Sequence, residues 1–551
     1  MVFKSIVPSV DIPHVDVATF CINASRENVS SPDTPAYVDI STHAILTYGQ
    51  LYTMHEQISS GLLHRLNVRS GDVAAIFASN SVHYAPIVLG IISSGAVCCP
   101  VNSAFGESEL EYQLHDSRAS VLFVGPMQLS IVCKARAAGQ VDIPLDRIVV
   151  IGESRHTEFT SLQELLDERP YRHLCDNLNI DVMAVLVYSS GTTGLPKGVM
   201  LSHRNIVACA VLYAAMSRFL DDHEPNARSD QIRGPIRSLA ILPFAHIYGL
   251  TSLITNSIAS GRTQYIMPNF SIDAFLQAVQ DYCINATSVV PSVLAQLSTK
   301  DTSKYNLSSL RMLGSGAAAL SGGVHARMRQ QFAATTANGY GMSETCSGVC
   351  IMSSFMFTPG SVGFLLPNME AKIVDLQTGR KQSVSEEGEL CVRGPLVMMG
   401  YLNRSDETQA VIDSDGFLHT GDIGYIDAQG LVFITDRIKS LIKYKGLQVA
   451  PAELESILMD HPQIADAAVI GVDDQRRHSE VPMALVVPRE LNPDRDELRA
   501  SIEEWVGARV ADHKRLRGGV VFVAQIPRSS VGKIMHRDLR AQFNAQRMAK
   551  I

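Results

Sequence analysis

The most informative part of this 551-residue chain is Tyr188-Ser189-Ser190-Gly191-Thr192-Thr193-Gly194-Leu195-Pro196-Lys197-Gly198-Val199-Met200. A short apolar run, residues 182–187, precedes it and is predicted to form a buried strand. Gly191 and Gly194 allow backbone conformations that turn N–H groups toward an anion. Further donors come from the hydroxyls of Ser189, Ser190, Thr192 and Thr193 and from the ammonium of Lys197. The composition therefore predicts a loop that holds polyphosphate.

The spacing excludes the common P-loop, which needs Gly, four residues and then Gly-Lys-Ser/Thr. A flexible surface loop is the alternative interpretation. The stretch resembles the phosphate-binding signature of the adenylate-forming superfamily, which includes acyl-CoA synthetases, luciferases and peptide-synthetase adenylation domains. Further signatures of that superfamily follow in the same order along the chain, and they favour the functional interpretation.

Length and composition indicate an enzyme-like protein of more than one domain, because 551 residues exceed what one hydrophobic core supports. The net charge of −8 and the absence of a long basic run give no support for nucleic-acid binding. The ten cysteines lack paired metal-ligand spacing, so we expect reduced, small hydrophobic residues of an intracellular protein.

The two ends of the chain and its longest apolar stretch bear on targeting. The N-terminus lacks the pattern of a secretory signal. Residues 84–101 contain Pro86 and Gly95 and are predicted to be a buried helix leading into a strand rather than a transmembrane span. Ala549-Lys550-Ile551 has the small-basic-aliphatic pattern of a peroxisomal tail. Recognition by a peroxisomal import receptor and a chance tripeptide in a cytoplasmic protein both remain open.

Strand-like runs alternate with helical patterns through the first three quarters of the chain, which predicts an α/β fold. A helix is expected from Thr47 to about Leu66, a strand at 73–77, and a helix at 272–282 that Ser288 to Pro291 break. The character changes near Asp436. Beyond it we expect helices at 452–459 and 498–510 and strands at 467–472 and 483–487. The predicted architecture is a large N-terminal αβ domain of several subdomains, residues 1–435, and a small mobile C-terminal α+β domain, residues 436–551.

A second match is Asn338-Gly339-Tyr340-Gly341-Met342-Ser343-Glu344, which resembles the superfamily motif aromatic-Gly-x-Thr-Glu. The resemblance implies that the Tyr340 ring stacks on adenine, that the Ser343 hydroxyl contacts the α-phosphate and that Glu344 binds magnesium. Ser343 replaces threonine and keeps the hydroxyl. Carboxylate and phosphate oxygens suit Mg²⁺. Residues 314–319 match the preceding turn on the adenine side.

The stretch 241–249 is predicted to be an apolar strand ending in His246, and a core histidine is the structural alternative. The resemblance places His246 and Tyr248 at the border of an acyl pocket. By alignment with plant coumarate ligases the pocket also includes Ser252, Ala317, Gly348 and Val349. Gly348 stands where those enzymes often carry valine, which indicates a roomier or longer pocket.

Two shorter stretches follow. Thr420-Gly421-Asp422 matches a motif in which the carboxylate accepts both ribose hydroxyls. The stretch that begins Gly388-Glu389-Leu390 and runs to Thr408 also matches, and is interpreted mainly as scaffold.

Residues 436–455 resemble the 4-coumarate–CoA ligase branch. That resemblance makes Asp436 the hinge, lets Arg437 contact the ribose, brings Lys443 and Gln448 to the adenylate and gives CoA contacts to Lys445 and Gly446. Residues 527–534 resemble the C-terminal signature whose lysine, here Lys533, reaches the carboxylate and the α-phosphate. An ammonium between two anionic groups lowers their repulsion in the transition state.

Together these motifs predict an ATP-dependent carboxylate–CoA ligase that uses ATP, Mg²⁺ and CoA and forms an acyl-adenylate. Its substrate is a small carboxylic acid, for which an aryl-propenoate, a medium- or long-chain fatty acid and a polyunsaturated acid remain open. The alternatives are a stand-alone adenylation enzyme that loads a carrier protein, a luciferase-like oxygenase and a nucleotide-binding homologue without catalysis.

Overall fold

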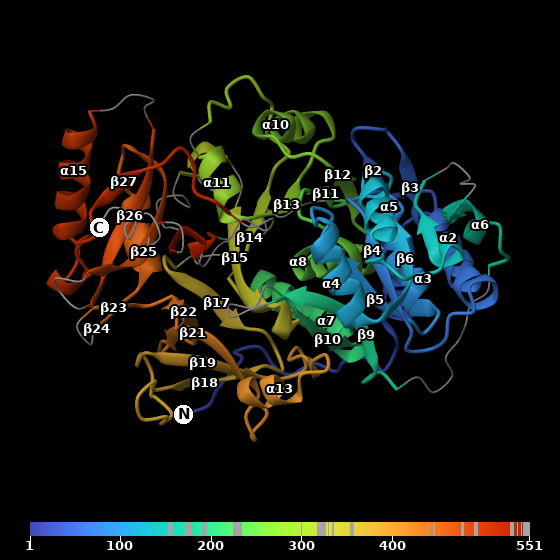
Figure 1. Ribbon diagram of the computed structural model, residues 1–551, viewed down its shortest axis with the longest axis horizontal. Coiled ribbons are helices and arrows are strands. Elements are labelled where there is room, and N and C mark those ends of the chain that lie inside the picture. The colour runs from blue at the N-terminus through green and yellow to red at the C-terminus, as the bar shows by residue number, and fades with distance from the viewer. Residues whose placement is uncertain are drawn as a thin grey trace.

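The computed structural model describes residues 1–152, 158–170, 179–189, 195–223, 234–298, 300–316, 327–328, 330–332, 335–352, 358–438, 440–444, 447–474, 479–489, 494–528, 534–536, 538–540 and 543. Two large sheets with their helices make up most of the molecule, and a smaller unit with its own sheets ends the chain (Figure 1).

The first large sheet has eight strands in the order β20-β10-β9-β5-β4-β6-β7-β8. Its central strands run parallel and are fully buried, as expected for a sheet covered by helices on both faces. The strands are β4 (Val73–Phe77), β5 (Val97–Val101), β6 (Ala119–Val124), β7 (Ile148–Val150), β8 (Thr160–Ser161), β9 (Met183–Ser189), β10 (Lys197–Ser202) and β20 (Gly400–Tyr401). The helices are α2 (Tyr48–Ser60), α3 (Tyr84–Ser93), α4 (Glu107–Ser117), α5 (Leu129–Ala137) and α6 (Leu162–Leu166).

Several predictions for this sheet are confirmed. Thr47 caps α2 in a capping box with Gln50, and a π-helical turn, Gly61–Arg65, extends the helix to the predicted end. The strand at 73–77 has the predicted bounds. The apolar stretch 84–101 is the buried helix α3 followed by the buried strand β5. In the described part of the chain, no helix has both the length and the apolar character needed to cross a membrane.

The second large sheet has fourteen strands in the order β1-β18-β19-β21-β22-β17-β16-β15-β14-β13-β11-β12-β2-β3. Parallel pairing links β2, β12, β11, β13, β14 and β15, and antiparallel pairing links β15 onward to β1. The strands are β1 (Phe3–Lys4), β2 (Pro35–Asp39), β3 (Ile45–Thr47), β11 (Arg237–Ala240), β12 (Thr263–Ile266), β13 (Ala286–Val289), β14 (Met312–Ser315), β15 (Thr335–Met342), β16 (Ser347–Ile351), β17 (Ser361–Leu365), β18 (Glu370–Val374), β19 (Gly388–Arg393), β21 (Leu418–Ile426) and β22 (Leu431–Arg437).

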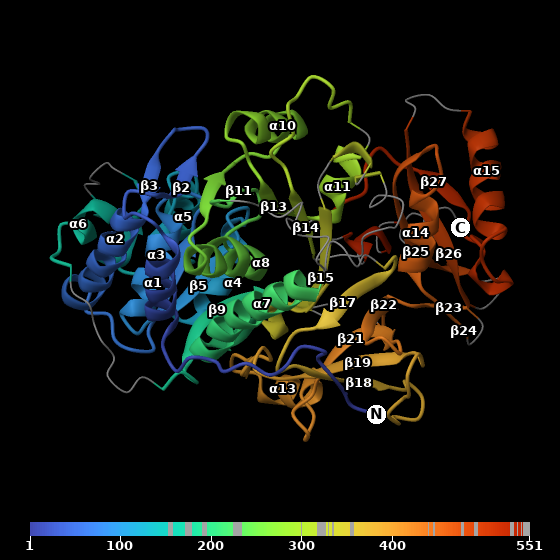
Figure 2. The same ribbon diagram turned by 180° about the vertical axis from the view of Figure 1, so that it is seen from behind.

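Helices cover the parallel half of this sheet, and α1 and α7 contact each other and the short helix α9 (Figure 2). The helices are α1 (Val17–Asn28), α7 (His203–His223), α8 (Ile247–Gly249), α9 (Asn256–Ala259), α10 (Ile272–Asp281) and α11 (Pro291–Leu297). A further helix, α13 (Ser405–Val411), contacts β20 of the first sheet and β21 of the antiparallel half. A π-helical stretch, Leu250–Thr255, joins α8 to α9 without a break.

Two predictions in this half are wrong. The strand expected to end at His246 stops at Ala240, because Pro243 lacks an N–H and the Asn80 side chain bonds Leu242 O and Phe244 N. Ser288 lies inside β13, and Pro291 begins α11 at the helix position where a missing N–H costs nothing.

The C-terminal unit packs around a hydrophobic cluster built only from residues between Ile442 and Leu539. It contains β23 (Ile442–Tyr444) and β24 (Leu447–Val449), a three-stranded sheet of β25 (Ile464–Asp474), β26 (Ser479–Pro488) and β27 (Val520–Phe522), and the helices α14 (Pro451–Met459) and α15 (Arg495–Gly507). The predicted strands and helices of this region are confirmed, with α15 beginning three residues earlier than expected. Asp436, the predicted boundary, lies near the end of β22.

Candidate active site

A cavity of about 1610 Å³ lies against strands of both large sheets. Many of the residues predicted from separate motifs line it: Ser189, Lys197, His246, Tyr248, Ser252, Asn338, Gly339, Tyr340, Ser343, Glu344, Gly348, Asp422 and Arg437. They come from the end of β9, from β10, β15, β16, β21 and β22, from the 3-10 turn after β15 and from the segment around α8. The fold therefore gathers motifs that are far apart in sequence around one space.

Asp422 is a buried acid in the cavity wall, and both of its oxygens are bonded. Only 2% of it is exposed; its Oδ2 accepts from Tyr340 Oη at 2.6 Å, and its Oδ1 lies 2.8 Å from Arg437 Nε. The carboxylate raises the pKa of Arg437, and burial together with Asp422 raises the pKa of Tyr340. Each carboxylate oxygen still has a lone pair to offer, so the two ribose hydroxyls of a nucleotide can also bond here.

The turn that presents Asp422 depends on Glu389, which the sequence reading treated as scaffold. Gly421 has φ +71°, and its N–H donates to Glu389 Oε1 at 3.0 Å. Glu389 Oε2 lies 2.7 Å from His419 Nδ1, and this bond raises the pKa of His419. On its other side, His419 Nε2 lies 3.6 Å from Asp413 Oδ2. Glu389 therefore holds the turn and its histidine in one arrangement.

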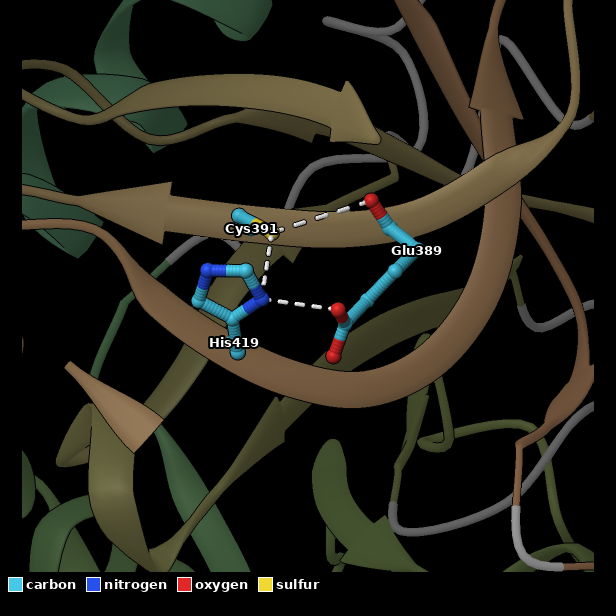
Figure 3. A group of neighbouring side chains, drawn as sticks. All are labelled: Glu389, Cys391 and His419. Atoms are coloured by element: carbon cyan, nitrogen blue, oxygen red, sulfur yellow. Dashed lines mark hydrogen bonds and ion pairs between the residues drawn. The ribbon is translucent and has the colours of Figure 1, made fainter. Parts of the chain in front are cut away.

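Cys391 completes this group, and the three side chains converge from the neighbouring strands β19 and β21 (Figure 3). Their ligand-type atoms lie within 4.8 Å of one another, as in many metal sites. Hydrogen bonding accounts for the approach, because Cys391 Sγ lies 3.4 Å from His419 Nδ1 and 3.8 Å from Glu389 O. Burial raises the pKa of the thiol, so it stays protonated and is a poor ligand.

Glu344 sits where three segments meet. Its Oε1 accepts hydrogen bonds from Ser189 Oγ at 3.0 Å and from Tyr401 Oη at 2.9 Å. Lys197 forms an ion pair with Glu407, and its Nζ lies 5.0 Å from the centre of the Tyr401 ring. A carboxylate beside hydroxyls at the end of the phosphate-loop strand is a hard oxygen donor set that fits Mg²⁺. Tyr401 and Glu407 were missed because they lie in the stretch interpreted as scaffold.

The adenine side of the cavity has two polar atoms to offer. Asn338 Oδ1 and Ser315 Oγ are buried and have no hydrogen-bond partner within the described residues. Both residues line the cavity, on the paired strands β15 and β14. A buried polar atom without a partner is costly, and a ligand bearing N–H groups would remove that cost.

Four of the residues predicted for the acyl pocket line the cavity. His246 caps α8 through Nδ1, which accepts from Tyr248 N at 3.2 Å, and its ring lines the cavity with Tyr248, Ser252 and Gly348. Val349 does not belong to this wall among the described residues. It is fully buried in the hydrophobic core.

The extra room predicted at Gly348 is already filled. A Cβ built on Gly348 would lie 1.9 Å from the hydroxyl oxygen of Tyr213, a residue of α7 that also lines the cavity. Gly348 therefore makes space for a protein side chain, and the prediction of a roomier pocket at this position is wrong. No motif pointed to Tyr213, because it lies on a helix far from Gly348 in sequence.

The other predicted site residues either lie away from the cavity or belong to parts of the chain that the structure does not describe. Lys443 is exposed on β23 and faces Gln448 across the two-stranded ladder, and neither is among the described residues of the cavity wall. Asp436 is buried, which raises its pKa to about 7, and its Oδ2 has no hydrogen-bond partner among the described residues. Outside the described residues lie Ser190, Gly191, Thr192, Thr193, Gly194, Ala317, Lys445, Gly446, Lys533, Ala549, Lys550, Ile551 and the side chain of Gln448.

Comparison with known proteins identifies the family to which the chain belongs. The family model described as AMP-binding enzyme matches residues 25–402, and the model described as AMP-binding enzyme C-terminal domain matches residues 453–533. The chain belongs to the AMP-binding enzyme family. The resemblance stated from the motifs is thereby confirmed.

Individual relatives of this AMP-binding enzyme span nearly its whole length. 4-Coumarate–CoA ligase 3 of Arabidopsis thaliana is 35% identical over 98% of this chain and 94% of its own. Luciferin 4-monooxygenase of Photinus pyralis is 35% identical over 92% of this chain and 91% of its own. The structure of the anthranilate CoA ligase AuaEII with anthranoyl-AMP superposes with a TM-score of 0.85 at 24% identity, covering 96% of this chain and 98% of that one. The predicted fold of the adenylate-forming enzymes is confirmed.

Proposed function

We propose that this AMP-binding enzyme is an ATP-dependent carboxylate–CoA ligase, an AMP-forming acid–thiol ligase that works through an acyl-adenylate. The observation that carries the proposal is the single cavity in which Asp422, Glu344 and Lys197 meet His246 and Tyr248. The first three suit the ribose and the phosphates of ATP, and the last two border the space for an acid. The relatives that are CoA ligases over their whole length support the same reaction.

The chemistry explains why these groups are needed together. A carboxylate is a poor electrophile because its leaving group would be oxide, so the acid first attacks the α-phosphorus of ATP. Asp422 and Tyr340 hold the ribose and adenine side, Asn338 Oδ1 accepts from the adenine amino group, and Lys197 offsets phosphate charge. Lys533 lowers the repulsion between the carboxylate and the α-phosphate. The products are an acyl-adenylate, whose AMP is a good leaving group, and pyrophosphate.

Glu344 is the residue that we propose would bind magnesium. Its Oε1 accepts a hydrogen bond from Ser189 at the end of the phosphate-loop strand. A bound Mg²⁺ would neutralise charge on the phosphates during adenylation.

In the second half-reaction, the transfer of the acyl group to CoA, residues of the C-terminal unit have proposed roles. The proposed domains are residues 1–435 and 436–551, joined by a hinge at Asp436. Rotation about that hinge replaces Lys533 by Lys445 and Gly446, which guide the CoA thiol to the acyl carbonyl, while Lys443 and Gln448 contact the adenylate. We further propose that the chain is peroxisomal and that its import receptor reads Ala549-Lys550-Ile551.

The first test measures pyrophosphate release with ATP and Mg²⁺ against cinnamates, benzoates and fatty acids of several lengths, with and without CoA. CoA-dependent formation of a thioester supports the ligase. Pyrophosphate release without thioester overturns it in favour of a carrier-protein acceptor. Light emission or oxygen consumption after adenylation would indicate oxygenase chemistry, and ATP binding without turnover of any acid would indicate a non-catalytic homologue.

A second test separates the two half-reactions. Lys533→Ala is expected to slow adenylation by roughly 10²- to 10³-fold and to spare thioester formation from supplied acyl-adenylate, since it removes a transition-state donor of the first step only. The control is Lys134→Ala, an exposed lysine of α5. Equal losses in both half-reactions would contradict the proposed division of labour.

A further inference from the structure

The cavity does not end at the acyl pocket beside His246. Tyr248, Ser252, Asn256 and Ser260 all line it, and they recur at intervals of four residues along the helical segment from α8 to the end of α9. Residues four apart lie on one face of a helix. At the rise of an α-helix this face would span about 18 Å from Tyr248 to Ser260, and the π-helical stretch Leu250–Thr255 makes it shorter. The space therefore continues well beyond the reach of a small aromatic acid.

Two other helices close the sides of this channel. Phe20 and Ala24 line it from one face of α1, and Ala210 and Ala214 line it from one face of α7. Both pairs are spaced by four residues. These four residues are apolar and leave room for an extended chain. Ser217 and Arg218, further along α7, also line the cavity and are exposed, so the α7 wall becomes polar beyond Ala214.

The far end of the channel is lined by polar side chains, in contrast to the apolar residues of α1 and α7 described above. Asn28 and Ser260 line it and are exposed, so the channel opens to solvent there. Asn256 Oδ1 and Arg262 Nε are buried and lack hydrogen-bond partners within the described residues. Arg262 follows α9 and lines the same cavity.

Arg262 has no counter-charge in the part of the chain that the structure describes. No described carboxylate forms an ion pair with its guanidinium, and no described group accepts a side-chain hydrogen bond from it. Burial lowers the pKa of Arg262, which agrees with a poorly solvated cation. A guanidinium in this setting gains most from an oxygen anion, and next from a neutral oxygen acceptor.

We propose that the channel between α1, α7 and α8–α9 selects an extended carboxylic acid that carries an oxygen acceptor at its far end, which Arg262 and Asn256 bind. A second carboxylate is the strongest acceptor of this kind, and a hydroxyl uses the same site through Asn256 Oδ1 and the guanidinium. The inference rests on the proposed ligase function and narrows its substrate class. It disfavours short aryl acids and plain alkanoic acids, because these leave Arg262 without a partner.

The experiment compares acids of equal chain length that end in a methyl, a hydroxyl or a carboxylate, at several lengths around that of the channel. Thioester formation is followed and kcat/KM determined for each. The expected order is carboxylate, then hydroxyl, then methyl, with the difference emerging only at lengths that reach Arg262. Arg262→Met is expected to lower kcat/KM for the carboxylate-ended acid by roughly 10- to 100-fold, the scale of one charged hydrogen-bond pair, and to spare the methyl-ended acid.

Two further variants keep the result interpretable. Arg237→Met removes an exposed arginine from β11, the strand that pairs with β12, and it does not line the cavity; it is expected to change nothing. Ala24→Leu narrows the channel before the polar end and is expected to lower activity with every long acid while sparing short ones. Activity of Arg262→Met with the methyl-ended acid shows that this variant is folded.

The outcomes separate this inference from the function it rests on. Equal use of the three termini, or an equal effect of Arg262→Met on all of them, overturns the proposed selection while the ligase remains. Long acids that are insensitive to Ala24→Leu do not occupy the channel, which also overturns it. Failure of every acid in every variant contradicts the ligase function itself.

Discussion

The two ends of the cavity differ in how their polar groups are partnered. At the nucleotide end, both oxygens of Asp422 are bonded, Glu344 accepts two hydroxyls and Lys197 has an ion pair with Glu407. At the far end of the channel, Arg262 and Asn256 each bury a polar atom without a partner among the described residues. The contrast teaches that the groups proposed for the ribose and phosphates of ATP are already partnered within the protein, whereas Asn338 and Ser315 on the adenine side and Arg262 and Asn256 in the channel have polar atoms still to be bonded.

The largest effect is expected from a substitution at the nucleotide end of the cavity, where the side chains already bond one another. Asp422→Asn removes the charge that Arg437 and Tyr340 bond and that we propose for the ribose hydroxyls, so kcat/KM for ATP should fall roughly 100-fold or more. Pyrophosphate exchange at varied ATP concentration measures it. The control is Asp415→Asn, an exposed acid in the turn before β21. A loss below about threefold would show that Asp422 serves the fold rather than the nucleotide.

A smaller effect is expected from the middle of the cavity. Gly348→Ala places a methyl group 1.9 Å from the Tyr213 hydroxyl, so the ring must move into the acyl space. We expect about a tenfold loss in kcat/KM for bulky acids, with little change for ATP. The double variant Gly348→Ala/Tyr213→Ala should recover much of that loss, because the clash is gone. Additive losses in the double variant would contradict the steric explanation.

The smallest effect concerns pH and the support of Asp422. The bond from His419 to Glu389 raises the pKa of that histidine, so its contribution is complete below the ordinary value of about 6.5 and is lost as pH rises through the raised value. KM for ATP should therefore rise a few-fold as the pH passes through the raised pKa of His419.

In Glu389→Gln the rise in KM should begin at lower pH, because the partner charge is gone. His115→Gln, which changes an exposed histidine of α4, is the control and should leave the profile unchanged. A profile that Glu389→Gln does not move would show that His419 has no part in holding the Asp422 turn.

Much of the fold was predictable where the signal is local. Buried strands such as β4 and helices such as α2 follow from apolar periodicity and a capping residue, which involve only neighbours in the chain. The strand expected before His246 was wrong because a side chain from another subdomain, Asn80, bonds that backbone. No pattern within 241–249 carries that information.

The candidate site divides in the same way. Motifs pointed to Asp422, Glu344 and Tyr340, yet Glu389 was taken for scaffold and Tyr213 was missed. Each of the two acts through a residue that is distant in sequence. A contact between two residues that are distant in sequence produces no local motif, so the sequence alone does not reveal it.

The amino-acid sequence by itself determined the reaction class, because phosphate and ribose are bound by short loops whose glycines, hydroxyls and charges are contiguous. Only the tertiary structure decided the shape of the acyl cavity. Its walls come from three helices and two sheets, and whether a glycine opens space or receives a tyrosine depends on how those elements pack. The packing also brings Arg262, which follows α9 in sequence, to the wall of the same cavity as residues of α1 and α7.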